Sequence, residues 1–103
     1  ARLRYTGTPT VNCMFMASVS LEIDTAITNK EFAVALHKNG TLITGTKIVG
    51  FSPATTVNSV NLYTIGYASM ATNDYISAFV ANMDSTDNLT IRNAQLMGMS
   101  LVT

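Results

Sequence analysis

The chain has 103 residues, six basic and six acidic side chains, no formal net charge and one cysteine. Charged residues make up only 12% of it, against roughly 25% in ordinary soluble domains, and 32 Thr, Ser and Asn residues supply much of the remaining polarity. This length predicts a single domain spanning residues 1–103. The composition argues against a disordered chain, a nucleic-acid partner, a zinc site, a disulfide framework and a membrane span.

The hydrophobic pattern has a period of two residues rather than the period of a helix, which predicts strands. The clearest case is residues 13–24, where one face is apolar from Cys13 to Ile23 and the other carries Met14, Met16 and polar residues. A short strand at 3–5 and a strand at 32–38 are also expected.

The Asn39-Gly40 pair follows the strand at 32–38 and is the strongest turn signal in the chain. Both residues tolerate positive φ, as a type I′ hairpin turn requires. We expect the returning strand to cover 42–51, with Gly45 and Gly50 as points of bending or bulging.

Further strands are predicted at 57–65, 75–82 and 89–102, with a loop at 68–74 and a turn at 84–88. The alternation of the last strand changes phase near Arg92 and Asn93, which predicts a break there. Six to eight strands without a helix indicate an all-β fold, an antiparallel sandwich or barrel.

Several strands are apolar on both faces, so both faces should be covered. A chain without helices has nothing of its own to cover the outer face of a sheet, and we therefore expect contacts with other copies. From these residues alone a dimer and a trimer fit equally well. The predicted interface residues are Met14, Met16, Tyr75, Phe79, Met97, Met99 and Leu101.

The side chains that could carry chemistry do not form a convincing site. Cys13 is expected to be buried and His37 to be solvated at the end of a hairpin arm, so a nucleophilic pair is not predicted. Glu22 and Asp24 share a strand face, but are interpreted as polar strand-end residues. An oxygen-rich stretch contains Asp84, Asp87 and Asn88, without the spacing of a known calcium loop. We expect no catalytic residue, no metal and no cofactor.

Two matches to the glycosylation sequon begin at Asn39 and Asn88. The first is accounted for by hairpin chemistry, and both are interpreted as incidental.

The order of short segments resembles the C1q/TNF-type jelly roll. The resembling segments are Ala-Ser-Val-Ser-Leu at 17–21, Leu-His-Lys-Asn-Gly-Thr-Leu-Ile at 36–43, Val-Asn-Leu at 60–62, Asn-Asp-Tyr-Ile at 73–76 and Asn-Leu-Thr-Ile at 88–91. The tyrosine segment of that family usually begins with Gly, which Asn73 replaces here. The chain is also shorter than a typical member, so peripheral strands are expected to be reduced or missing.

The resemblance is closest to compact versions in bacteriophage structural proteins. It implies a jelly-roll sandwich and a homotrimer, with Tyr75, Phe79 and the last strand lining the threefold axis. The function it implies is a non-enzymatic capsid cement or decoration protein on the virion surface, with the major capsid protein as partner. The alternatives are the receptor-binding head of a head or tail fibre, with a host-surface glycan as ligand, and a secreted C1q/TNF-like ligand.

Overall fold

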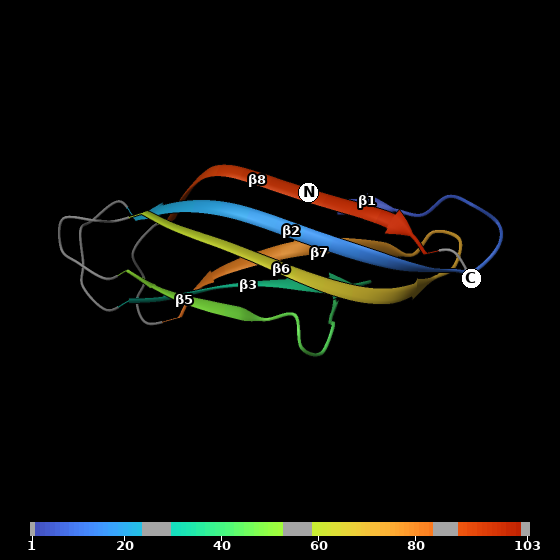
Figure 1. Cartoon of the computed structure of the whole chain (residues 1–103), viewed down its shortest axis with the longest axis horizontal. Helices are drawn as coiled ribbons and strands as arrows, with labels where there is room; N and C mark the ends of the chain where they lie inside the picture. Colours follow the sequence, from blue (N-terminus) through green and yellow to red (C-terminus); the bar gives the residue numbers. More distant parts are fainter. Residues whose placement is uncertain (1, 24–29, 53–58, 84–88, 102–103) are drawn as a thin grey trace.

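Two antiparallel sheets stack face to face in the computed structural model, which describes residues 2–23, 30–52, 59–83 and 89–101 (Figure 1). The five-stranded sheet has the order β1-β7-β3-β4, and β5 pairs with β3 beside β4. Its strands are β1 (Arg2–Arg4), β3 (Lys30–Lys38), β4 (Thr41–Leu42), β5 (Ile48–Ser52) and β7 (Tyr75–Asn82).

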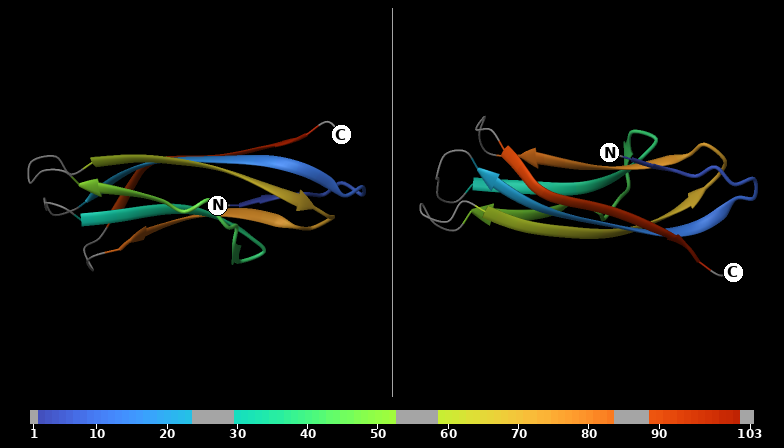
Figure 2. Two further views of the ribbon diagram at one scale, coloured as in Figure 1. Left: turned by 60° about the horizontal axis from the view of Figure 1, so that its bottom comes forward. Right: turned by 90° about the horizontal axis from the view of Figure 1, so that it is seen from above.

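The three-stranded sheet has the order β6-β2-β8. Its strands are β2 (Val11–Ile23), β6 (Ser59–Met70) and β8 (Leu89–Ser100). Figure 2 shows the two layers from two further directions. No helix occurs in the described ranges, and so none that could cross a membrane. The prediction of an all-β antiparallel sandwich is confirmed.

β2 lies at the centre of the three-stranded sheet, and its alternation places one apolar row between the sheets. Five consecutive members of that row are buried: Cys13, Phe15, Ala17, Val19 and Leu21. Val11 at the start of the row is partly buried. The facing layer comes mainly from β3, where Phe32, Val34 and Leu36 are fully buried. Packing these two rows together is the main source of hydrophobic stabilisation in the sandwich.

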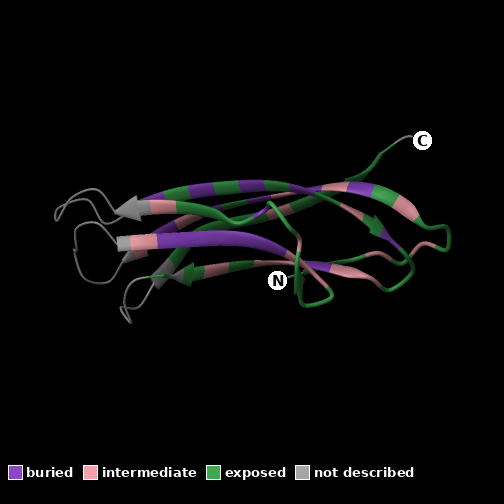
Figure 3. Cartoon of the chain, turned by 90° about the horizontal axis from the view of Figure 1, so that it is seen from below, coloured by how far each residue is buried: buried purple, intermediate pink, exposed green. Residues whose placement is uncertain are grey.

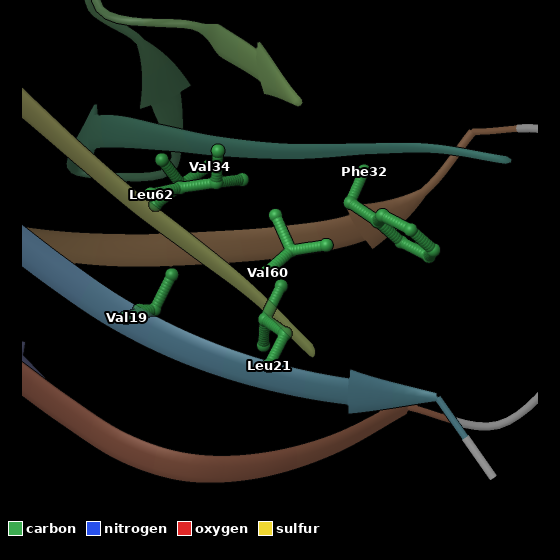
Figure 4. Close-up of a cluster of buried hydrophobic side chains, with 6 residues drawn as sticks. All are labelled: Val19, Leu21, Phe32, Val34, Val60 and Leu62. Atoms are coloured by element: carbon green, nitrogen blue, oxygen red, sulfur yellow. The ribbon is translucent and has the colours of Figure 1, made fainter. Parts of the chain in front are cut away.

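The core consists of two neighbouring clusters along the length of the sandwich. Figure 4 shows the first, in which side chains of β2, β3 and β6 meet between the sheets. The second lies toward the other end of β2 and gathers around Phe15, Leu36, Met70 and Ile76. The two clusters together hold the sheets against each other along much of the length of the sandwich.

β3 is buried on both faces between Phe32 and Leu36, the continuous purple stretch in Figure 3. Its outward-facing residues are Ala33 and Ala35, which pair with Val49 and Phe79 on the neighbouring strands. Each of these small side chains thus has one larger neighbour, Val49 beside Ala33 and Phe79 beside Ala35. Side chains of neighbouring strands therefore cover part of the outer face of the five-stranded sheet.

The hairpin turn at Asn39 and Gly40 is confirmed, with φ of 51° and 86°. The predicted single return strand over 42–51 is wrong, because the chain pairs with β3 only as β4 and then again as β5. Gly45, with φ of 86°, turns the chain between them. Gly50 has a different role: a Cβ there would lie 2.6 Å from Leu62 Cδ2, so glycine permits the close approach of β5 to β6.

The predicted strand at 75–82 coincides with β7. β6 runs five residues past its predicted end at residue 65, so the predicted loop begins only after Met70. The predicted break in the last strand is confirmed, since the register with β2 shifts at Ser20/Leu21, opposite Arg92. The predictions for 24, 57–58, 84–88 and 102 fall outside the described residues.

Candidate functional site

The outer face of the three-stranded sheet is the most unusual surface of the described chain, because it is largely apolar and has no layer over it. We call it the methionine face and define it by three aligned rows. They are Asn12, Met14, Met16 and Ser18 of β2; Ser69, Tyr67, Ile65 and Tyr63 of β6; and Leu101, Met99, Met97 and Gln95 of β8 and its end.

The strand register brings the four methionines together at the centre of this face. Met14 pairs with Met99 and Met16 pairs with Met97, so the two rows lie side by side. Met97 and Met99 are each 56% exposed, whereas the β2 methionines are half-buried because they have neighbours on both sides. The flexible thioether side chain adapts to irregular partner surfaces, which favours methionine at interfaces.

Aromatic side chains extend the methionine face over β6. Tyr67 pairs with Met14 and is 63% exposed, Ile65 pairs with Met16, and Tyr63 is 68% exposed. Tyrosine combines large apolar area with a polar tip and is enriched where two proteins meet. These residues are not among the predicted interface residues, although apolar Val60 and Leu62 alternate with them and indicate that the odd-numbered residues of β6 face outward.

None of the residues that define the methionine face is charged. The nearest charged pair along β2 and β8 is Glu22 and Arg92, where Arg92 Nε donates to Glu22 Oε2 at 2.6 Å. This hydrogen bond lowers the pKa of the Glu22 carboxyl and raises that of Arg92. The two opposite charges pair with each other, so they leave the apolar rows electrostatically neutral.

The predicted interface residues fall on two separate surfaces. Met14, Met16, Met97, Met99 and Leu101 share the methionine face. Tyr75 and Phe79 belong to β7 in the other sheet and point outward on the opposite side of the sandwich, since Ile76 of the same strand is buried between the sheets. One flat contact on one protomer therefore cannot include both groups.

The outer face of the five-stranded sheet combines aromatic rings with cations. The guanidinium carbon of Arg2 lies 4.7 Å from the centroid of the Tyr75 ring. The His37 ring packs edge-on against Phe79 with centroids 4.3 Å apart. The prediction that His37 is solvated is wrong: it is half-buried against Phe79, and its Nδ1 has no hydrogen-bond partner among the described residues.

Cys13 and His37 do not form a pair. Cys13 is buried between the sheets as predicted, and His37 packs on the outer face against Phe79. Glu22 is paired with Arg92, and Asp24 lies outside the described residues. Within the described ranges, no three His, Cys, Asp or Glu side chains are placed to hold a metal ion.

Asn39 joins the hairpin to the turn before β7. Its side-chain Nδ2 donates to Asp74 Oδ1 at 2.9 Å, and its Oδ1 accepts from the Tyr75 N–H at 3.0 Å. These contacts give the Asn39 amide a structural role. Asp74 also accepts from the Ala71 N–H, and the two hydrogen bonds lower the pKa of its carboxyl.

Comparisons with protein-family models, curated proteins and solved structures found no match to this chain.

Proposed function

We propose that this chain is a non-enzymatic structural protein that forms homotrimers and decorates a bacteriophage capsid as a cement protein. The observation that carries the self-association is the methionine face: an uncharged, apolar sheet face with Met97 and Met99 more than half exposed. Monomeric proteins rarely leave such a contiguous patch in water, and patches of this kind mark sites of association. The low charge of the whole chain favours the same conclusion.

The jelly-roll and virion parts of the proposal come from the resemblance in segment order. The strand order supports the jelly-roll part, because successive strands pass from one sheet to the other except along β3, β4 and β5, and crossing between two facing antiparallel sheets is typical of jelly rolls.

The mechanism is mechanical. Burying a large apolar side chain contributes about 1.5–3 kcal/mol, and the methionine face offers several such side chains from each copy. A trimer then presents three copies of every remaining surface to the capsid. Multivalent contacts raise avidity without requiring a strong individual contact.

The direct test of this function is immunogold electron microscopy of virions of the phage that encodes the protein. We expect gold over the whole capsid surface at regularly spaced sites. Gold confined to fibre tips would contradict the cement function and support the fibre head, and unlabelled virions would exclude both.

A receptor-binding fibre head is the second candidate, and one observation favours it. A groove on the outer face of the five-stranded sheet is lined by Arg2, Tyr75, Ser77 and Phe79. Aromatic rings beside hydrogen-bonding side chains are suited to binding sugars. Binding to a glycan array that is lost in Tyr75→Ala and retained in Met97→Ala would support this alternative.

A further inference from the structure

Among the described residues, the edge of β8 that faces away from β2 has no partner strand, since β8 ends the strand order of its sheet. The Leu101 N–H donates to Asn12 O at 2.8 Å, so Leu101 points its backbone groups toward β2. In an antiparallel ladder these directions alternate. It follows that the backbone N–H and C=O groups of Gln95, Met97 and Met99 point toward β2. Four residues present free N–H and C=O groups on the open side: Ala94, Leu96, Gly98 and Ser100.

An apolar cleft lies beneath this free edge, between the two sheets. One cavity of about 340 Å³ lies under Gly98 and Ser100, and its floor includes Phe15, Val11 and Met70. Among the described residues that line it, the one charged residue is Arg4 of β1. A second cavity of about 140 Å³ follows along β8, lined by Val19, Val80 and Leu96 among others. Phe15 reaches the cleft because residue 98 is glycine: a Cβ there would lie 2.7 Å from its Cε1.

The cleft is open because the opposite sheet ends in a short strand. β1 has three residues, whereas β8 has 12. Leu3 of β1 approaches β8 at Gly98, where its Cδ1 would lie 3.6 Å from an added Cβ. Three residues on the cleft side of β8 are nevertheless exposed: Ala94, Gly98 and Ser100.

This edge also lacks the usual protection against pairing with other chains. Proteins guard long edge strands with lysine, proline or inward-pointing charge. The only charged residue in the sequence of β8 is Arg92, which is paired with Glu22. Residues 93–101 contain neither charge nor proline.

We propose that β8 accepts an extended strand donated by another polypeptide, which adds to the sheet and fills the cleft. The donor's backbone would pair with the four free residues of β8. Its inward side chains, spaced roughly 6.8 Å apart as every second residue of a strand, would enter the two cavities. The matching donor is uncharged and apolar at alternate positions. Under the proposed function, the donor strand is a segment of the capsid protein. Only the identity of the donor rests on that function.

A second copy of the chain fits this edge less well. If two β8 strands paired with each other, the side chains brought to the cleft would be Ala94, Leu96, Gly98 and Ser100. Three of these are small, so most of the cavity volume would stay empty. Donors with larger alternate side chains gain more, since packing removes voids along with apolar surface.

The test uses the full chain and a capped peptide of residues 13–21 with Cys13→Ser. This segment of β2 already pairs with β8 in the fold and places Phe15, Ala17 and Val19 on one face. The control peptide has the same side chains but is N-methylated at these three residues, which removes the N–H groups that would face β8. Amide hydrogen exchange of the protein is followed residue by residue with NMR.

We expect the peptide to slow exchange at Ala94, Leu96, Gly98 and Ser100 by about tenfold or more, and the control peptide to leave it unchanged. Ala94→Pro removes one outward N–H without touching the β2 ladder and should weaken the peptide's apparent affinity at least about tenfold, whereas Ala94→Val should retain it. Unchanged exchange at saturating peptide would overturn the proposal. So would slow exchange of these amides without peptide that becomes fast on dilution, because a second copy would then occupy the edge.

Failure of this inference can be told apart from failure of the proposed function. Met16→Asp places a charge on the methionine face while leaving the β8 edge intact. Peptide binding should persist in this variant even if assembly is lost. If the wild-type protein is monomeric and still binds the peptide, the trimer is refuted and the strand-accepting edge stands; if it assembles without binding the peptide, the reverse holds.

Discussion

The Thr46 hydroxyl makes backbone hydrogen bonds that a neighbouring strand would otherwise supply. The chain leaves β3 between β4 and β5, and there Thr46 Oγ1 accepts from the buried Leu36 N–H at 3.1 Å and donates to Ile43 O at 2.8 Å. Its own carbonyl accepts from Thr64 Oγ1. Buried backbone groups need such partners, because an unsatisfied one costs free energy.

We therefore predict that Thr46→Val destabilises the protein by about 1–3 kcal/mol, since the shape is kept while the Leu36 N–H loses its partner. Thr46→Ser retains the hydroxyl and should lose less. Urea unfolding followed by circular dichroism measures both variants. Equal stabilities of Thr46→Val and the wild type would show that this hydrogen bond is not needed.

Asp74 gives stability a defined dependence on pH. Hydrogen bonds from Asn39 and Ala71 hold the pKa of its carboxyl below the ordinary value of 3.8. The folded state therefore binds fewer protons than the unfolded state once the pH approaches 3.8. The stabilisation from Asp74 is complete above that pH and is lost as the pH falls through the lowered pKa.

The matched variant is Asp74→Asn, which cannot ionise. The difference in unfolding free energy between the wild type and Asp74→Asn should be constant from pH 7 to pH 5 and shrink below pH 4. Urea titrations at several pH values measure it. A difference that stays constant down to pH 2 would be inconsistent with a lowered Asp74 pKa.

The β3–β4 hairpin depends on both the backbone and the side chain of Asn39. Its φ of 51° lies in the left-handed region, and its amide contacts Asp74 and Tyr75. Asn39→Gly keeps the backbone freedom and loses the contacts, so we expect a loss of about 1 kcal/mol. Asn39→Ala loses both and should cost about 1–2 kcal/mol more. Thermal unfolding of the two variants measures which is the less stable. If the turn is unstrained, Asn39→Ala will unfold at the higher temperature of the two.

Strands were predictable where local pattern decides them. The alternation in β2 placed its buried row correctly, and the phase change near Arg92 located a bulge. The interruption after β4 was not visible, because a threonine hydroxyl replaces a backbone partner there and nothing local signals that replacement. Likewise, the sequence grouped Tyr75 and Phe79 with the methionines, since period two gives the faces of each strand but not which sheet the strand joins.

At the scale of the whole molecule, the sandwich has two outer faces of different character. The five-stranded sheet partly covers its own outer face through β3 alanines and their larger neighbours, whereas the methionine face has no such cover. The methionine face is thus the surface of the described chain from which charged side chains are missing. This asymmetry is the physical basis for expecting assembly through the three-stranded sheet.

The charge sensitivity of the methionine face follows from the same asymmetry. Met97→Asp or Met99→Asp would place an uncompensated carboxylate in an apolar contact, where burying an unpaired charge is prohibitive. Both side chains are more than half exposed in a single chain, so the folded protomer should tolerate the change. Thr44→Asp is the matched control, because it adds the same charge at an exposed position away from this face.

The most direct measurement is the molar mass of the purified protein at micromolar concentration, by size-exclusion chromatography with light scattering. We expect three times the 11.0 kDa chain mass for the wild type and for Thr44→Asp, and the chain mass for Met97→Asp and Met99→Asp with unchanged circular dichroism. A monomeric wild type, or methionine variants that remain trimeric, would contradict assembly through the methionine face.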